Sequence, residues 1–223
     1  MRVLQLLPEL KFGGVERGTV DLSEHLTKLG HQSAVVSAGG GLTEQLSDHG
    51  AKHFSLPIAK KNFLAIRQYK NLRDIYREFK PDIIHVRSRF PAWINVLALK
   101  DLSSSKPIVI STFHGLYSKP FYSKSMSYAD DIIAISKTVQ EYIFKNYNVD
   151  HSRVHLIYRG CDINEFNTST PSEAWSNAWY KEFPQTSNKI LLTLPGRITG
   201  WKGIEDFLKL LSQLDQAKYH GLI

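Results

Sequence analysis

Short apolar runs alternate with amphipathic segments along most of the chain. The first run, Val3–Leu7, has the length of a strand, and apolar residues at helical spacing follow it after a turn. Gly30 ends that helical pattern, and a second apolar run follows at Ser33–Ser37. A strand, a helix and a strand in this order predict a parallel pair joined by a right-handed crossover. The predicted inward face of the helix holds Val15, Thr19, Leu22, Leu26 and Leu29.

The same alternation continues toward the end of the chain. Further strands are predicted near His53–Leu56, at Ile83–Val86, from Pro107 to the His114-Gly115 pair, at Ile132–Ile135, from Val154, and at Ile190–Leu194. Further helices are predicted at Leu42–Asp48, within Pro57–Lys80 (inward residues Leu64, Leu72, Ile75 and Phe79), at Lys137–Tyr147, and from Ile204. This order predicts an α/β fold with a doubly wound, mostly parallel, Rossmann-like sheet.

Composition narrows the class of protein. The chain has 223 residues, of which 42% are hydrophobic, and no apolar run has the length of a membrane span. Its single cysteine, Cys161, excludes an internal disulfide and suits a reducing, cytoplasmic location. The formal charge of +7 favours anionic partners such as phosphates, nucleic acid or an acidic membrane surface.

Two glycine-containing turns have the chemistry of an anion site. Gly13-Gly14 follows the first strand and opens a helix, where backbone N–H groups can face a phosphate. The strand Ile190–Leu194 leads through Gly196 and Arg197 to Lys202-Gly203 and a second helix start, which adds two cations. Each turn has a simpler explanation, as a flexible loop or as a helix start with solvated cations.

Polar residues at other strand ends are further candidates. Arg87 and Arg89 follow a strand and predict either a bound anion or a surface ion pair. His114 follows the next strand, where its simplest explanation is a loop histidine that caps the strand, whereas His85 lies within a strand and is interpreted as a core residue. Ser136 is in the position of a helix N-cap.

Several motifs occur together and in order. They are F-G-G-V-E-R at 12–17, P-D-I-I-H at 81–85, A-D-D-I-I-A-I-S at 129–136, R-G-C-D at 159–162 and G-R-I-x-x-x-K-G at 196–203. This set resembles the retaining glycosyltransferases of family four, which have the GT-B fold of two facing Rossmann-like domains. The S-R-F-P-A-W segment at 88–93 resembles a bacterial subgroup that makes cell-surface polysaccharide or lipopolysaccharide. Arg159 departs from the pattern, because most members carry asparagine there.

The resemblance implies a domain organisation and a set of site residues. Residues 1–167 correspond to the N-terminal, acceptor-side domain, 168–188 to a linker, and 189–223 to the beginning of an incomplete nucleotide-sugar-binding domain. The resemblance assigns the donor diphosphate to Gly13, Gly14, Arg197, Lys202 and Gly203, and the catalytic roles to His114, Arg197 and Lys202. Acceptor or anion binding is predicted for Arg87, Arg89 and Ser136, the two arginines because they follow a strand.

The resemblance also implies an activity. A sugar would pass from a nucleotide-sugar, with retention, to a glycan or lipid-linked acceptor, with no metal and no further cofactor. The family's downstream E-x7-E carboxylate motif is absent from this sequence, so we expect the 223-residue chain alone to be inactive. The alternative is a non-catalytic domain that binds anionic glycans or nucleotides and needs a partner. No nucleic-acid-binding motif accompanies the positive charge, so no nucleic-acid partner is expected.

The segment Pro57–Lys80 is the most basic part of the chain. Its cations are Lys60, Lys61, Arg67, Lys70, Arg73, Arg77 and Lys80. A helix with one apolar and one basic face is either a solvated surface helix or one that contacts an anionic membrane or guides a phosphorylated acceptor. The second interpretation predicts a peripheral protein at the inner face of the membrane.

Overall fold

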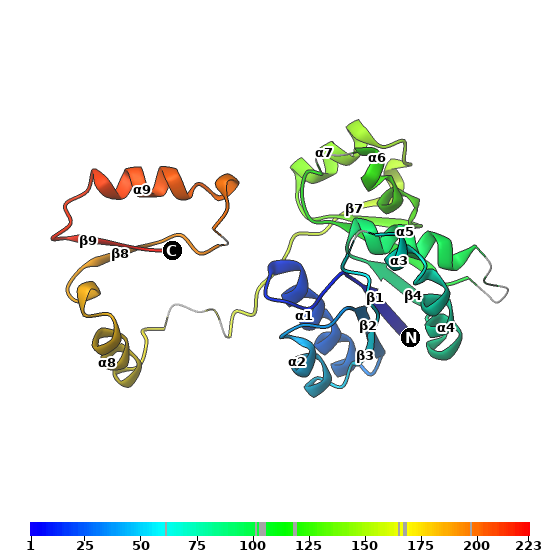
Figure 1. The fold of residues 1–223 in the computed structure, drawn as a ribbon, viewed down its shortest axis with the longest axis horizontal. Helices are drawn as coiled ribbons and strands as arrows, with labels where there is room; N and C mark the ends of the chain where they lie inside the picture. The colour runs from blue at the N-terminus through cyan, green and yellow to red at the C-terminus, as the bar shows by residue number, and fades with distance from the viewer. Residues whose placement is uncertain are drawn as a thin grey trace. The chain divides into compact units, whose positions relative to one another are not determined.

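The structure, a computed structural model, describes residues 1–60, 62–100, 102, 106–117, 120–164, 166, 169–196 and 198–223. These residues form two compact units, Met1–Gly160 and Cys161–Ile223. The first unit contains a large sheet with helices, and the second contains a small βαβ element (Figure 1).

The elements of the first unit follow the alternation predicted from the sequence. Its strands are β1 (Arg2–Leu6), β2 (Gln32–Ser37), β3 (Lys52–Ser55), β4 (Ile83–Val86), β5 (Ile108–Phe113), β6 (Asp131–Ala134) and β7 (Val154–Leu156). Its helices are α1 (Gly14–Lys28), α2 (Thr43–Asp48), α3 (Phe63–Ile66), α4 (Tyr69–Phe79), α5 (Arg89–Leu99), α6 (Pro120–Ser123) and α7 (Lys137–Asn146).

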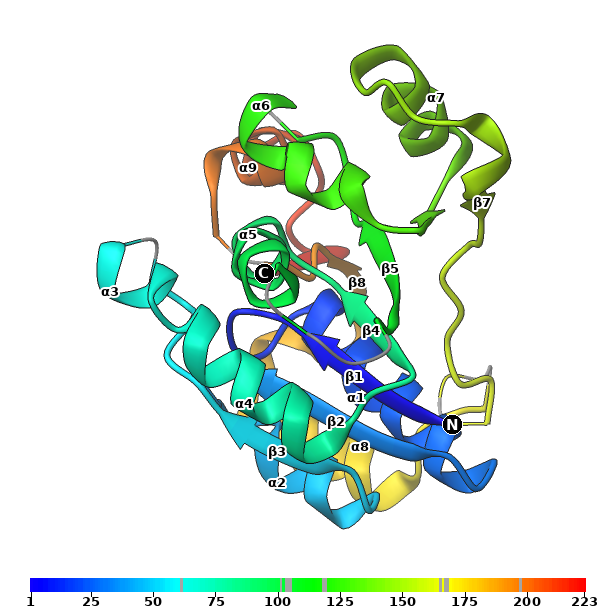
Figure 2. The same ribbon diagram turned by 90° about the vertical axis from the view of Figure 1, so that its right-hand side faces the viewer.

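The sheet of the first unit is parallel and doubly wound. Its seven strands lie in the order β3-β2-β1-β4-β5-β6-β7, and every neighbouring pair is parallel. The chain runs from β1 out to β3 and then crosses to β4, so the winding reverses between β1 and β4. Figure 2 shows α1 and α2 on one face of the sheet and α4 and α5 on the other. The predicted α/β class with a mostly parallel, Rossmann-like sheet is therefore confirmed.

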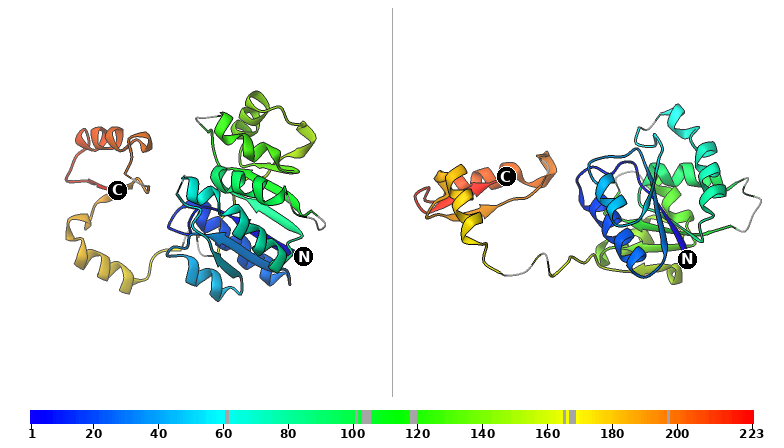
Figure 3. Two further views of the ribbon diagram at one scale, coloured as in Figure 1. Left: turned by 45° about the vertical axis from the view of Figure 1, so that its right-hand side comes forward. Right: turned by 90° about the horizontal axis from the view of Figure 1, so that it is seen from below.

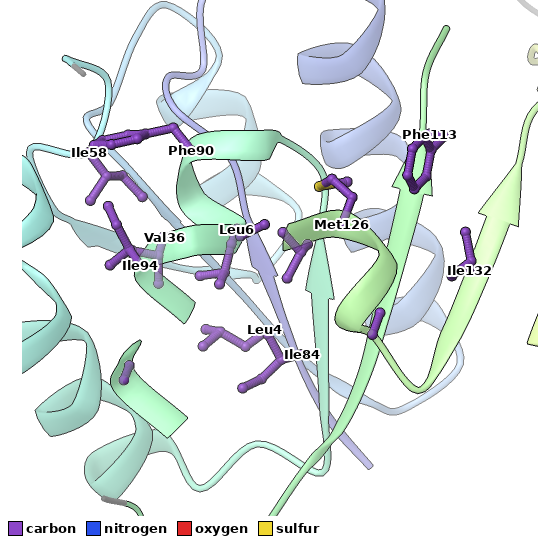
Figure 4. Packing of buried hydrophobic residues seen from close by; sticks show 14 of the residues in the cluster. Leu4, Leu6, Val36, Ile58, Ile84, Phe90, Ile94, Phe113, Met126 and Ile132 are labelled. Atoms are coloured by element: carbon purple, nitrogen blue, oxygen red, sulfur yellow. The ribbon is translucent and has the colours of Figure 1, made fainter. Parts of the chain in front are cut away.

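Successive side chains of a strand point to opposite faces of the sheet, so each strand contributes to the packing on both faces. Leu4 and Leu6 of β1 join Val36, Ile84 and other buried residues in the main apolar cluster on the α4–α5 face (Figure 4). A smaller cluster on the α1–α2 face includes Val20 and Leu46. Burying apolar surface on both faces of a parallel sheet is the main force that stabilises this architecture.

Two predicted helix faces are wrong in part. The buried residues of α1 are Thr19, Val20 and Ser23, whereas Leu29 is the C-cap and is 60% exposed. The single helical face predicted for the basic segment is divided between two helices, α3 and α4. Leu64, predicted to point inward, is 69% exposed. The helical period locates an apolar stripe, but the neighbouring elements decide which part of it is covered.

Gly40 is a position where the backbone requires glycine. Its φ is +151°, and a Cβ there would overlap the backbone of Leu10 and lie 2.7 Å from the backbone nitrogen of Lys11. We expect Gly40→Ala to lower the free energy of unfolding by about 2 to 4 kcal/mol, measured by urea denaturation. Gly115→Ala is the matched control, because an added Cβ meets no atom within 4 Å there. Equal losses in the two variants would contradict the assignment of strain to Gly40.

The second unit contains one βαβ element. Strands β8 (Ile190–Thr193) and β9 (Tyr219–Leu222) pair in parallel, and α9 (Ile204–Ser212) connects them (Figure 3). Helix α9 packs closely on β9, since a Cβ on Gly221 would overlap the side chain of Leu211. The strand predicted at Ile190–Leu194 and the helix predicted from Ile204 are confirmed. Helix α8 (Glu173–Glu182) precedes them, with Ser172 as its N-cap.

Candidate functional site

The reversal of winding between β1 and β4 creates the usual ligand-binding position of an open α/β sheet. Ligands bind outside the carboxyl ends of the strands at such a switch point. Gly13-Gly14 follows β1, Arg87 follows β4, and His114 follows β5, which is the next strand. Three of the predicted site elements therefore gather at one edge of the first unit.

The N-terminus of α1 is open to solvent at this edge. Gly13 is its N-cap with extended backbone, no side chain caps the helix from that position, and both Gly13 and Gly14 are exposed. The carboxylate of Glu16 lies against Gly13, at the position of the missing Cβ. The N–H groups of a first helical turn favour anionic groups.

Gln5 connects α1 to β4, although sequence reasoning did not single it out. Its Nε2 donates to the carbonyl of Thr19 at 3.0 Å and to Ser23 Oγ at 2.8 Å. Its Oε1 accepts a hydrogen bond of 3.0 Å from Nη1 of Arg87. The bond to Ser23 Oγ explains why this polar side chain is buried, whereas the hydroxyl of Thr19 donates to the carbonyl of Val15 at 2.8 Å. The signal in the sequence was an amide within an apolar strand.

Arg87 is buried next to this glutamine. It is 7% exposed, and its Nε has no hydrogen-bond partner among the described residues. Burial, followed by the nearby charge of Arg159, lowers the pKa of Arg87 to about 10, and Asp21 and Glu16 act in the opposite direction. The guanidinium therefore remains charged at neutral pH.

Arg159 joins the site from the far edge of the sheet. It follows β7, and the chain returns from there toward α1 (Figure 1). Its Nη2 donates to the carbonyl of Gly14. A Cβ on Gly18 would lie 2.6 Å from Nη2 of Arg159 and 3.4 Å from Nη2 of Arg87, so both guanidinium groups meet above Gly18. The sequence offered two signals, an arginine in place of asparagine and a glycine inside a helix.

His114 lies close to both arginines. Neither of its ring nitrogens, which are buried, has a hydrogen-bond partner among the described residues. Burial first, then Arg87 and Arg159, lower its pKa to about 3, so the imidazole is neutral at pH 7. His85, interpreted from the sequence as a core histidine, is confirmed as one: it is buried and bonded to Thr112 Oγ1 at 2.7 Å.

The lowered pKa of His114 makes stability depend on pH. Between pH 3 and 6.5 the unfolded chain binds a proton at this residue that the folded chain does not, so stability falls as the pH falls. We expect wild type to lose about 3 kcal/mol more than His114→Leu between pH 6.5 and pH 4. Urea denaturation at the two pH values measures this difference. Parallel losses would contradict the assigned pKa.

Arg89 and Ser136, which the sequence groups with Arg87, have different surroundings. The guanidinium of Arg89 lies over the rings of Tyr117, at 4.7 Å, and Tyr122, at 5.2 Å. Ser136 caps α7, where its Oγ accepts a 3.2 Å bond from the N–H of Val139. The structure therefore groups Arg87 with Arg159 rather than with Arg89.

The candidate residues of the second unit form a turn before α9. The side chain of Lys202 passes 3.9 Å from the Cβ position of Gly196. Gly203 has a φ of +75°, which favours glycine, and it precedes the first turn of α9. Arg197, the other predicted cation, lies outside the described residues, as does Lys61 of the basic segment.

A hollow of about 610 Å³ lies beside α3, after the ends of β2 and β3. Its lining combines apolar and cationic side chains, among them Ala38, Pro57, Lys60, Leu64 and Arg67.

In the described part of the chain, no helix combines the length and apolar character needed to cross a bilayer.

This chain is similar to several known proteins. The family model Glycosyltransferase Family 4 matches residues 12–165. The uncharacterized glycosyltransferase MJ1607 of Methanocaldococcus jannaschii is 24% identical over 219 residues, which cover 91% of this chain and 56% of that protein. The chain thus spans little more than half of this relative.

Solved structures show the same fold. A glycosyltransferase from Rickettsia africae ESF-5 superposes with a TM-score of 0.81 at 29% identity, over 99% of this chain and 59% of its own. Alr3699/HepE of Anabaena, solved in complex with UDP and glucose, superposes with a TM-score of 0.80 at 18% identity, over 100% of this chain and 60% of its own.

Proposed function

Since this chain belongs to glycosyltransferase family 4, we propose that it is part of an enzyme that transfers a sugar, with retention, from a nucleoside-diphosphate donor. The observation that carries the proposal is the convergence of an uncapped helix N-terminus, a neutral histidine and two guanidinium groups at the switch point of the sheet. This edge offers both an anion-binding surface and an uncharged hydrogen-bonding group for a sugar.

Each unit contains residues that we propose for binding the donor diphosphate. In the first unit, Gly13 and Gly14 offer backbone N–H groups to the diphosphate. In the second, Lys202, the start of α9 at Gly203, and Arg197 supply positive charge. The complex of the Anabaena protein with UDP and glucose supports a nucleotide-sugar as donor. No further cofactor and no metal enters the proposal.

The chemistry follows from where charge develops. Breaking the anomeric C–O bond leaves negative charge on the diphosphate, and cations and N–H groups aimed there stabilise the transition state. His114 is neutral at pH 7, so it can donate to or accept from a sugar hydroxyl without adding a competing charge. The leaving phosphate then accepts the proton of the acceptor hydroxyl.

Nucleotide binding and product analysis test this function. Calorimetric titration of the protein with UDP, GDP and UMP should show a diphosphate binding more tightly than UMP, because the second phosphate adds charge. Proton NMR of the product that the natively expressed protein forms from a nucleotide-sugar should show an unchanged anomeric configuration. Equal affinity for UDP, GDP and UMP, or an inverted product, would reject the proposal.

We place the acceptor among glycans or lipid-linked sugars of the bacterial cell surface, which the S-R-F-P-A-W segment supports. The basic segment 57–80 then makes a peripheral membrane contact, for which Leu64 and the cation-lined hollow beside α3 are suited.

Charge reversal tests this membrane contact. Replacing Lys60, Arg67 and Lys70 with glutamate should reduce cosedimentation with vesicles that contain anionic lipid by about tenfold or more, because each cation near such a surface contributes about 1 kcal/mol. Vesicles of neutral lipid are the control. Unchanged sedimentation with anionic vesicles would remove the membrane contact from the proposal.

A further inference from the structure

Arg87 and Arg159 form a pair of like charges with spare hydrogen-bond donors. Nη1 of Arg87 is occupied by Gln5, and Nη2 of Arg159 by the carbonyl of Gly14. The Nε of Arg87 is buried and has no partner in the described part of the chain. Nη2 of Arg87 faces the same point above Gly18 as the guanidinium of Arg159.

Asp21 and Glu16 are near enough to raise the pKa of Arg87, but neither forms an ion pair with it. Asp21 is bonded to Arg17 at 2.8 Å, and Glu16 lies against Gly13. Among the residues that the structure describes, no carboxylate is within ion-pairing distance of Arg87 or Arg159. Two cations held together in a partly buried place are unfavourable unless an anion joins them.

Glycines keep the space between these groups and solvent open. Gly13, Gly14 and Arg159 are exposed, so a solute can reach the pair. Gly18 has no side chain, and a methyl group there would displace Arg159. A glycine inside a helix lowers stability by about 1 kcal/mol relative to alanine, which suggests that the open space has a use.

We propose that Arg87 and Arg159 together bind one oxyanion, a phosphate or carboxylate carried by the acceptor. Guanidinium groups bind such oxyanions through paired, charge-assisted hydrogen bonds. Both arginines belong to the unit Met1–Gly160, and neither is among the residues proposed for the donor diphosphate. The acceptor assignment rests on the proposed transferase function, but the anion site itself does not.

The direct test is a titration of the 223-residue protein with inorganic phosphate and with acetate, at constant ionic strength, followed by ¹H–¹⁵N NMR. We expect saturable shifts of the Gly18 amide and of the Arg87 Nε–H with at least one of the two anions. Arg159→Ala should weaken that binding by about tenfold or more. Absence of saturable shifts with both anions would overturn the site.

Two further variants make the result specific. Gly18→Ala keeps both arginines in the sequence, but its methyl group displaces the side chain of Arg159. This variant should weaken anion binding as Arg159→Ala does. Arg77→Ala removes the same charge from α4, where Arg77 pairs with Asp74 at 2.8 Å, and should change the affinity less than twofold. A similar loss in Arg77→Ala would reduce the effect to net charge and overturn the proposal.

Competition separates the acceptor from the donor. Phosphate or acetate should still bind when the protein is saturated with UDP or GDP, and Lys202→Ala should leave this binding unchanged. Displacement of the anion by the nucleotide would overturn the acceptor assignment. Failure of every nucleotide to bind would contradict the proposed function while leaving the anion titration as an independent result.

Discussion

Replacing Lys202 with alanine is expected to lower the rate of sugar transfer by about 10² to 10³-fold in the natively expressed enzyme. The side chain lies beside Gly196, in the turn that precedes α9. In the proposed reaction its charge stabilises the diphosphate more strongly as the bond to the sugar breaks, so kcat falls more than affinity. Release of nucleoside diphosphate from a nucleotide-sugar, measured at saturating and limiting donor, gives both parameters.

Two further substitutions test whether the effect is specific to the charge of Lys202. Lys209→Ala removes the same charge from the exposed side of α9, where Lys209 lies 3.9 Å from Asp206, and should leave the rate within about twofold. Lys202→Arg keeps the charge and should retain more activity than alanine. A Lys202→Ala enzyme with wild-type kcat would remove Lys202 from the catalytic residues.

Replacing Gln5 with leucine is expected to lower the free energy of unfolding by about 2 to 4 kcal/mol. Gln5 is fully buried, and its amide satisfies Ser23, the carbonyl of Thr19 and Nη1 of Arg87 at once. Leucine has a similar volume, so the loss comes from leaving a buried guanidinium with one acceptor fewer. Urea denaturation monitored by circular dichroism measures the change.

The same substitution at an exposed glutamine is the control. Gln32 begins β2 and is exposed, so Gln32→Leu should change the free energy of unfolding by less than about 0.5 kcal/mol. Adding Arg87→Met to Gln5→Leu should recover part of the loss, because the unsatisfied charge is then gone. A loss in Gln5→Leu no larger than in Gln32→Leu would contradict the structural role of this amide.

The strands were predictable because a parallel sheet is covered on both faces. Its strands therefore appear as short apolar runs, and the predicted Val3–Leu7 and Ile83–Val86 correspond to β1 and β4 within a residue. The helix faces were less predictable. Leu64 has the spacing of an inward residue, yet it lies on the short α3 and is exposed.

Part of the candidate site was predictable for a related reason. Gly13, Arg87 and His114 each follow a strand, and the carboxyl ends of parallel strands meet at one edge. The pairing of Arg87 with Arg89 was inferred from their distance along the chain. In the structure Arg89 contacts Tyr117 and Tyr122. The neighbouring charge that acts most strongly on the pKa of Arg87 is that of Arg159.

The amino-acid sequence by itself thus determined the α/β class, the succession of strands and helices, and the turns with anion-binding chemistry, because hydrophobic period and turn residues act over a few neighbouring positions. Only the tertiary structure decided that Gln5 bonds to Arg87, 82 residues later, and that Arg159 reaches Gly14, 145 residues earlier. Such contacts depend on the order of strands in the sheet and on the path of the chain after β7. No local pattern encodes that order, since each strand is apolar in much the same way wherever it is placed.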